Sequence, residues 1–416
     1  MSETANARPF ASIVGRMREV VGGFVGGERW RRMSRDESVR AAAYAFVFTR
    51  LIVFLVILVG GQINHIVGGT GNTTRDFHLS MGKIPVARLL RETVVVADIN
   101  WYAGIAENGY ERRRFDTETQ HNWAFFPLFP LLWRAAASVT GELAVTGILL
   151  SNLFFFCALV LLHKTTRAFS FDTATADRAV FYLAAFPTSY FFSLPMTEAL
   201  FLFLTVGSFY AARRRSWWLA GICGALASAT RVTGILLLPA LALLYWLTYR
   251  PDWRRRDALS LALVPVGLVS FMYYLYLVTG NPLAFKDILV TWGRSAGLFV
   301  VPLLQYLRHP LMIAIPWDFK LLNFAAAVTA LACGLVLLKR RQWTLAFYTL
   351  ASMVVALSSL LLQSQARYAM VVFPIFMVLA VAGRRARVDE LIRAVFLVLL
   401  GLMTALFAAH FSIAMA

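Results

Sequence analysis

The feature that most constrains this chain is the length of its apolar blocks, which short clusters of charge separate. The block AVFLVLLGLMTALFAAHF, near the C-terminus, is apolar on almost every side when it is drawn as a helix. A helix needs about 20 such residues to cross the hydrocarbon core of a bilayer. With 59% hydrophobic residues among 416, the chain has more of these blocks than a water-exposed fold can cover. The sequence therefore predicts an all-α, polytopic membrane protein.

The net charge of +18 is explained by membrane topology rather than by a nucleic-acid partner. Basic clusters recur between the apolar blocks, at residues 213–215, 250–256, 339–341 and 384–387. Short basic loops of this kind stay on the cytoplasmic side of a membrane. We therefore expect no nucleic-acid binding, a cytoplasmic N-terminal segment at 1–40 and a transmembrane domain over 41–416. Arginine far exceeds lysine, as in GC-rich bacterial genomes, which favours a bacterial plasma membrane.

Placing the basic clusters inside gives about eleven spans. The expected spans are 41–61, 143–162, the arms of two hairpins at 179–212 and 217–249, and then 258–279, 321–338, 343–362, 369–382 and 394–413. A large first extracytoplasmic loop covers 62–142, and a second covers 280–320. The hairpin arms, at about 14 to 18 residues, are short for a full crossing, so we expect their tips to surround a recessed cavity.

The segment 124–139, AFFPLFPLLWRAAASV, is the ambiguous element of this topology. If it crossed the membrane, every later loop would change sides and the basic clusters would lie outside. Pro127 and Pro130 suit the start of a helix but would interrupt the interior of a span. The sequence therefore predicts an interfacial or re-entrant helix here.

The segment ADINWYAGIAENGY, residues 97–110, carries the first candidate for chemistry. If it is helical, Asp98, Trp101 and Tyr102 share one face, and Gly109 can end the helix. One interpretation is that Asp98 only caps an amphipathic helix whose aromatic side chains lie in the headgroup layer. The other is that Asp98 faces a reaction centre at the membrane edge.

Isolated charges elsewhere in the apolar chain are the second set of candidates, because an ionisable group at membrane depth is costly unless it is paired or hydrated. Glu198 lies in PMTE at the tip of one hairpin, and Arg231 lies in ATRVTG at the tip of the next. Arg367 and Tyr368 lie in the outer segment QSQARY. All four are expected at the membrane level of Asp98, which favours one site. The alternative is that Glu198 and Arg231 form only a structural bridge.

Three further positions are weaker candidates. His121, beside the outer aromatic residues, is a candidate to bind phosphate or hydroxyl groups, although a hydrogen-bonded structural histidine is an equal alternative. Arg50, in the first span, is expected to extend toward the cytoplasmic surface. Asn72 begins a glycosylation sequon, which has meaning only in a host that modifies such sites.

Several kinds of mechanism find no support in the sequence. It contains no P-loop, no Gly-rich dinucleotide motif, no HExxH and no GxSxG, so a nucleotide-fed or hydrolase mechanism is not indicated. The three cysteines are far apart and lie within apolar runs, as expected of packing residues. No carboxylate cluster demands a metal ion, so we expect no metal and no cofactor.

In this order along the chain, the motifs resemble the PIG-V type of GPI mannosyltransferase and its bacterial relatives. That family carries a pattern like WDAxWYxxIAxxGY followed by AFFPLYP, and this chain has ADINWYAGIAENGY and AFFPLFP. The segments FPTSYFFSLPMTEALF and ATRVTG, and a late RY with Pro374 downstream, extend the resemblance. The sequence departs from the pattern at Ala97, where relatives have tryptophan.

The resemblance implies a GT-C-like glycosyltransferase that takes a hexose, expected to be mannose, from a polyprenyl-phosphate sugar. Members of that class carry an acidic residue in the first outer loop, which implies Asp98 as the general base. Arg231 or Arg367 would stabilise the phosphate leaving group during transfer with inversion. The expected substrate-binding residues are Trp101, Tyr102, His121, Glu198, Arg231, Arg367 and Tyr368. The expected acceptor is a glycan, a glycolipid or a protein, reached among membrane lipids.

Two other classes of function are open on the sequence. A transporter or flippase of polyprenyl lipids would use membrane charges to line a pathway rather than a reaction centre. A structural subunit would keep the fold without turnover. Inverted repeats and discontinuous helices would favour a transporter, and the sequence shows neither.

Overall fold

The computed structural model describes residues 36–69, 86–250, 256–308, 320–411 and 414. Every regular element in these ranges is an α-helix or a 3-10 helix, which confirms the all-α prediction. The sequon at Asn72, the N-terminal segment and parts of both expected outer loops lie outside the described residues.

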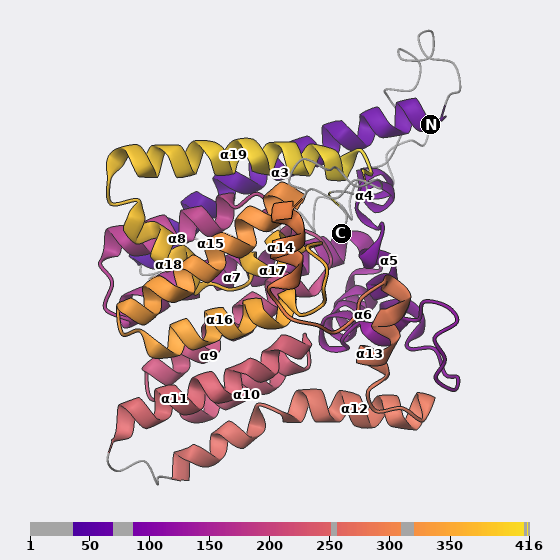
Figure 1. Ribbon diagram of the computed structural model, residues 1–416. Helices are drawn as coiled ribbons and strands as arrows, with labels where there is room; N and C mark the ends of the chain where they lie inside the picture. Colours follow the sequence, from indigo (N-terminus) through magenta and orange to yellow (C-terminus); the bar gives the residue numbers. More distant parts are fainter. Residues whose placement is uncertain (1–35, 70–85, 251–255, 309–319, 412–413, 415–416) are drawn as a thin grey trace, which may run out of the picture.

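The helices fall into three groups along the chain (Figure 1). The first comprises α3 (Glu37–Gly69), α4 (Val86–Val94), α5 (Asp98–Asn108), η2 (Asn122–Ala124), α6 (Leu128–Thr140) and α7 (Leu143–Ala168). The second comprises α8 (Thr173–Ala185), η3 (Ser189–Ser193), α9 (Thr197–Arg213), α10 (Trp217–Ser228), η4 (Val232–Leu236) and α11 (Leu237–Tyr249). The third comprises η5 (Arg256–Leu263), α12 (Val266–Thr279), α13 (Ala284–Asp287), η6 (Ile288–Trp292), α14 (Val301–Arg308), α15 (Lys320–Lys339), α16 (Trp343–Leu357), α17 (Gln365–Met370), α18 (Pro374–Ala382) and α19 (Ala386–Ala408).

Six helical stretches among the described residues are long and apolar enough to cross a bilayer. They are Glu37–Ile63, Leu143–Ala168, Val232–Tyr249, Arg256–Thr279, Lys320–Lys339 and Ala386–Ala408. Large apolar side chains such as Leu51 and Leu55 of α3 are mostly exposed on the outside of the bundle, as contact with lipid requires. The chain is therefore a multi-pass membrane protein, and the total of eleven spans stays a prediction.

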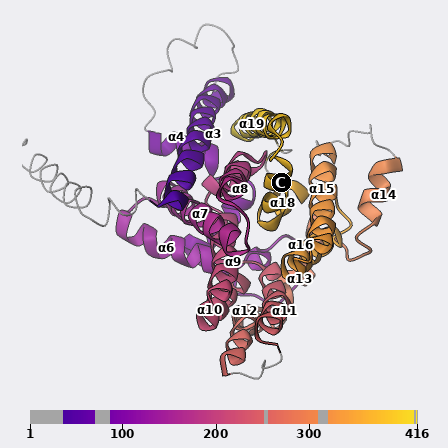
Figure 2. The same cartoon turned by 90° about the vertical axis from the view of Figure 1, so that its left-hand side faces the viewer.

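The two ends of the bundle differ in chemistry. The connections α7–α8, α9–α10, α15–α16 and α18–α19 lie at one end, which we call the basic face (Figure 1). Helices α4, α5, α6 and α13 lie at the opposite end, which we call the loop face. Figure 2 views the bundle from the basic face, where α3, α7 and α9 pack side by side. The clusters at 213–215, 339–341 and 384–387 thus share one face, as the positive-inside rule predicts.

The hairpin helices are short, as their sequence length indicates. Helices α8, α10 and α11 have 13, 12 and 13 residues, and α9 has 17. The 3-10 helices η3 and η4 connect α8 to α9 and α10 to α11, at the ends of the two hairpins nearer the loop face. Glu198 begins α9 directly after one such end, and Arg231 directly precedes η4 at the next.

Helix α6 has the geometry expected of a re-entrant or interfacial helix. Its 13 residues extend only about 20 Å, which is less than the thickness of a bilayer core. Pro127 precedes the helix and Pro130 lies in its first turn, where proline is tolerated. Gly141, with φ 76°, then lets the chain reverse into α7. The buried side chains of Phe129 and Trp133 fix α6 against its neighbours.

Arg50 is buried in the bundle, so the prediction that it extends toward the membrane surface is wrong. Its guanidinium donates to the carbonyl of Ala184 at 3.0 Å and to the carbonyl of Ser189 at 2.9 Å. It also donates to the hydroxyls of Ser189 and Ser193, at 2.8 and 3.0 Å. The carbonyl of Ala184 lies where α8 ends and lacks a helical partner, so the bend before η3 supplies acceptors that the sequence does not reveal. Arg50 therefore ties α3 to η3.

We expect Arg50→Met to lower the free energy of unfolding by about 3 kcal/mol or more, because four buried hydrogen bonds lose their donor. Thermal unfolding of the purified protein in detergent would measure this. Arg40→Gln, an exposed change on the same helix, is the control and should leave the midpoint nearly unchanged. Equal unfolding midpoints for the two variants would contradict the role of Arg50 in joining α3 to η3.

Candidate active site

Helix α5 presents Asp98 from its first turn. Ala97, the residue before it, has φ 49°, a left-handed conformation that costs a side-chain-bearing residue about 1 to 2 kcal/mol. Asp98 is the first residue of the helix and follows Ala97 at the N-cap position, so it does not occupy the cap position itself. The carboxylate instead accepts a hydrogen bond from Arg367, at 2.7 Å between Oδ2 and Nη1. Gly109, with φ 84°, ends the helix where the sequence predicts.

Four charged side chains from separate parts of the chain meet beside α5, and we call them the acid–arginine cluster: Asp98, Glu198, Arg231 and Arg367. Arg367 is the bridge, since its Nη1 bonds Asp98 and its Nε bonds Glu198 Oε1, both at 2.7 Å. Arg231 bonds the same Glu198 oxygen, also at 2.7 Å. The expectation that these charges converge on one site is met in the structure.

Glu198 holds both arginines in place. Its side chain is 0% exposed, and its Oε1 accepts from both Arg231 and Arg367. Its Oε2 is buried and has no hydrogen-bond partner within the described part of the chain. A buried carboxylate is tolerated only with cations beside it, and here two guanidinium groups supply them. Thr197 adds a contact of 3.3 Å to Arg231 and lies 3.4 Å from the hydroxyl of the buried Tyr102.

Exposure increases outward through the cluster. The side chain of Glu198 is 0% exposed, that of Arg367 is 7%, that of Arg231 is 17% and that of Asp98 is 33%. The two arginines are therefore held by Glu198 at the buried end of the cluster. The carboxylate of Asp98 is the most exposed member and the most open to an incoming molecule. A candidate general base must lie within reach of the hydroxyl from which it takes a proton, and the partial exposure of Asp98 meets this requirement.

Aromatic rings pack around Trp101, which lies one turn along α5 from Asp98. Trp101 stacks on Phe125, with ring centroids 5.8 Å apart, and Trp292 lies edge-on to both rings at 6.1 and 6.0 Å. Trp292 ends η6 in the segment that follows α12, so this segment folds over α5. Trp292 does not stand out in the sequence, because the signal it gives is an aromatic residue in an otherwise irregular stretch.

Tyr368 lies between two arginines. The Cζ atom of Arg231 lies 5.7 Å from the centroid of its ring, and the Cζ atom of Arg294 lies at the same distance. Such positions are typical of cation–π contacts. Arg294 is a second residue that the sequence analysis missed, because nothing in its neighbours connects it with a site more than sixty positions away.

His121 belongs to a separate group of contacts. Its Nδ1 lies 2.6 Å from Glu111 Oε2, and its Nε2 lies 3.2 Å from both Asp116 Oδ1 and Thr119 Oγ1. Its ring stacks on Trp123, with centroids 4.3 Å apart. Both ring nitrogens have partners within its own loop, which agrees with the structural alternative, and substrate binding by His121 stays a prediction.

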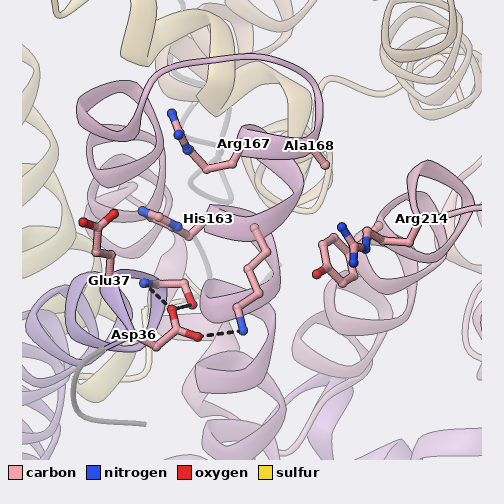
Figure 3. A pocket seen from close by; sticks show the side chains of 9 residues that line it. Asp36, Glu37, His163, Arg167, Ala168 and Arg214 are labelled. Atoms are coloured by element: carbon pink, nitrogen blue, oxygen red, sulfur yellow. Dashed lines mark hydrogen bonds and ion pairs between the residues drawn. The ribbon is translucent and has the colours of Figure 1, made fainter. Parts of the chain in front are cut away.

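A cavity of about 540 Å³ lies at the basic face, where α3 begins and α7 and α9 end (Figure 3). Asp36 lies 3.0 Å from the ammonium group of Lys164 and accepts a hydrogen bond of 2.6 Å from the Ser38 hydroxyl. The Ser38 hydroxyl, with help from Lys164, lowers the pKa of Asp36 to about 2. No member of the acid–arginine cluster lines this cavity, so it is distinct from the candidate active site.

The fold and the site together define a helical multi-pass membrane protein with a carboxylate and buried arginines near one face. The model of the mannosyltransferase (PIG-V) family matches residues 39–250, about half of the chain, and the chain belongs to this family. The match includes Asp98, Glu198 and Arg231, whereas Arg294 and Arg367 lie beyond it.

Curated relatives support the same family. GPI alpha-1,6-mannosyltransferase 2 of Rattus norvegicus is 32% identical over 149 residues, which cover 33% of this chain and 29% of the rat protein. The Cricetulus griseus protein of that name is 28% identical over 201 residues, which cover 43% of this chain and 39% of that protein. The similarity thus spans less than half the length of these relatives.

Solved structures show a weaker likeness. The oligosaccharyltransferase of Archaeoglobus fulgidus, tethered with an acceptor peptide, is 13% identical with a TM-score of 0.39, over 87% of this chain and 55% of that chain. The same archaeal protein in complex with an inhibitory peptide and a dolichol-phosphate gives the same TM-score, over 88% and 56%.

The cluster should behave as one energetic unit. We expect Arg367→Met to destabilise the protein by about 3 to 5 kcal/mol, since it leaves buried Glu198 short of a cation. Adding Glu198→Gln should cost less in this background than in the wild type, because one of the two arginine partners of Glu198 is already gone. A double-mutant cycle on thermal unfolding should therefore give a coupling above about 1 kcal/mol.

The exposed ion pair Arg88–Glu92 provides the matched control for this cycle. Its side chains are 69% and 43% exposed, so its coupling should stay below about 0.5 kcal/mol. If the effects of the Arg367 and Glu198 substitutions on the free energy of unfolding are additive, the two residues do not stabilise each other.

Proposed function

We propose that this chain is a glycosyltransferase that moves a hexose, in the first instance mannose, from a polyprenyl-phosphate sugar to an acceptor hydroxyl with inversion at the sugar carbon. The observation that carries the proposal is the position of Asp98: it is a third exposed, yet bonded to buried Arg367. Membership in the mannosyltransferase (PIG-V) family supports the choice of mannose.

In the proposed reaction, Asp98 takes the proton of the acceptor hydroxyl while that oxygen attacks the sugar carbon. The bond between the sugar carbon and the phosphate oxygen breaks, and the polyprenyl phosphate leaves with the bonding electron pair. When Asp98 gains the proton, the cluster loses one negative charge, so its net charge becomes more positive as the phosphate acquires charge. Arg231 and Arg367 are fixed beforehand by Glu198, and such fixed donors stabilise developing charge at little reorganisation cost.

The pairing of the buried charges supports a reaction centre over a transport pathway. Charges that line a pathway must face it, whereas Glu198 and Arg367 are 0% and 7% exposed and bond to each other. The alternative of a polyprenyl-lipid flippase would use the same charges as mobile contacts, which these short bonds do not favour.

The membrane orientation follows from the same proposal. The basic loops would lie in the cytoplasm together with the N-terminus, and the loop face would be extracytoplasmic. The donor's polyprenyl tail would lie among the spans, and its phosphate would reach the cluster at the level of the loop face. We place the protein in a bacterial plasma membrane on its composition, with a glycan, a glycolipid or a protein as the acceptor.

We expect Asp98→Asn to reduce turnover by about 10² to 10⁴-fold, because the amide keeps the shape of the side chain but cannot take a proton. The measurement is release of polyprenyl phosphate from polyprenyl-phosphate mannose by purified protein, with and without an acceptor extract. Glu107→Gln is the matched control, since Glu107 lies on the same helix and is exposed away from the cluster.

The outcomes separate the candidate functions. An Asp98→Asn variant that keeps more than half of wild-type release would remove Asp98 from the role of base. A wild-type protein that moves the lipid between leaflets unchanged, with no release of polyprenyl phosphate, would show the flippase instead.

A further inference from the structure

Arg294 lies near the acid–arginine cluster but has no role in the reaction proposed above. Its Cζ atom lies 5.7 Å from the ring centroid of Tyr368, whose ring also lies 5.7 Å from the Cζ atom of Arg231. A guanidinium group carries five N–H donors. No hydrogen bond or ion pair within the described ranges engages the side chain of Arg294, although it is half-buried. Its donors are therefore available to a ligand.

Packing on both sides of Arg294 fixes the segment that carries it. Two residues before it, Trp292 packs against Trp101 of α5 and against Phe125. Three residues after it, the backbone N–H of Gly297 donates to the carbonyl of Ser358 at 2.9 Å. A side chain at Gly297 would collide with Leu360, so the chain passes tightly there. Arg294 is thus fixed from both sides near α5 and near the segment leading to α17.

The balance of charge around Tyr368 indicates an anionic ligand. The two carboxylates of the cluster, Asp98 and Glu198, are already engaged by Arg231 and Arg367. Arg294 adds a third cation without adding a carboxylate. Like charges gathered in a partly buried place repel one another unless an anion joins them. The site therefore lacks one negative charge when it is empty of substrate.

We propose that Arg294 and Arg231, on the ring of Tyr368, bind the phosphate group of the lipid-linked donor. This inference rests on the proposed function and adds to it a phosphate-binding residue from the segment after α12. Guanidinium groups suit phosphate because their planar N–H pairs match its oxygens, and one phosphate can accept hydrogen bonds from two arginines. Arg367, which the proposed function also places near the leaving phosphate, is held by two carboxylates and positions Asp98 as well.

The test measures binding without turnover. Farnesyl phosphate and farnesol serve as probes that share the isoprenoid chain and differ in the phosphate group. The variants are Arg294→Gln and, as a matched control from the same segment, Lys286→Gln, whose side chain is exposed. Equilibrium binding to the purified full-length protein is measured for each, and thermal unfolding without ligand confirms that each variant is folded.

We expect wild-type protein to bind farnesyl phosphate at least tenfold more tightly than farnesol. Arg294→Gln should weaken farnesyl phosphate binding by about 10- to 100-fold, the effect of losing a charge-assisted contact, and should leave farnesol binding unchanged. Arg294→Lys should recover part of the affinity, because it keeps the charge but not the planar donor pair. In turnover assays, Arg294→Gln should raise the KM for the donor more than it lowers kcat.

Each contrary result overturns a different statement. If wild-type protein prefers farnesyl phosphate and Arg294→Gln binds it equally well, Arg294 is not a phosphate ligand, while the proposed function stands. If Arg294→Gln weakens both probes equally, the residue only maintains the fold and the assignment is wrong. If wild-type protein does not distinguish the two probes, the phosphate site fails, and with it the polyprenyl-phosphate donor of the proposed function.

Discussion

One oxygen atom, Oε1 of Glu198, connects the charged side chains of the site and the helices that carry them. It accepts from Arg231, which precedes η4, and from Arg367, which lies in α17, while Glu198 itself begins α9. Arg367 extends the connection to Asp98 and so to α5. A charge buried without partners would cost several kcal/mol, so none of these elements can move away alone. The position of the proposed base is therefore set by packing deep in the bundle, as preorganised catalysis requires.

The same arrangement combines a fixed inner part with a more open outer part. Its buried part is balanced, with Glu198 facing two cations, whereas its outer part has Asp98 partly exposed and Arg294 without a carboxylate. At the basic-face cavity, Asp36 and Lys164 form an ion pair with each other. A fold selected only for stability gains nothing from a half-buried arginine left without an acid. The imbalance beside Tyr368 is the arrangement that the proposed phosphate-binding role requires.

Much of this architecture could be predicted from the sequence because it depends on local patterns. Apolar length predicts the spans, the basic clusters predict their common face, and Pro127 with Pro130 predicts where α6 begins. Helical spacing predicts α5 with its end at Gly109. Isolated charge in apolar surroundings singles out Glu198 and Arg231 as candidate site residues. Each of these signals is contained within some twenty neighbouring residues.

The parts of the site that could not be predicted from the sequence depend on contacts between distant segments. Arg367 and Asp98 are 269 positions apart, and no local pattern pairs them. Arg50 looked like a residue that extends to the surface because its acceptors are carbonyls and hydroxyls freed at the bend before η3. Arg294 joins the site only because Trp292 packs on α5 and Gly297 passes close to Leu360. In each case the sequence shows an arginine whose charge needs partners, and only the packed structure shows which partners these are. Arg294, which no carboxylate among the described residues pairs with, is where the proposed phosphate would bind.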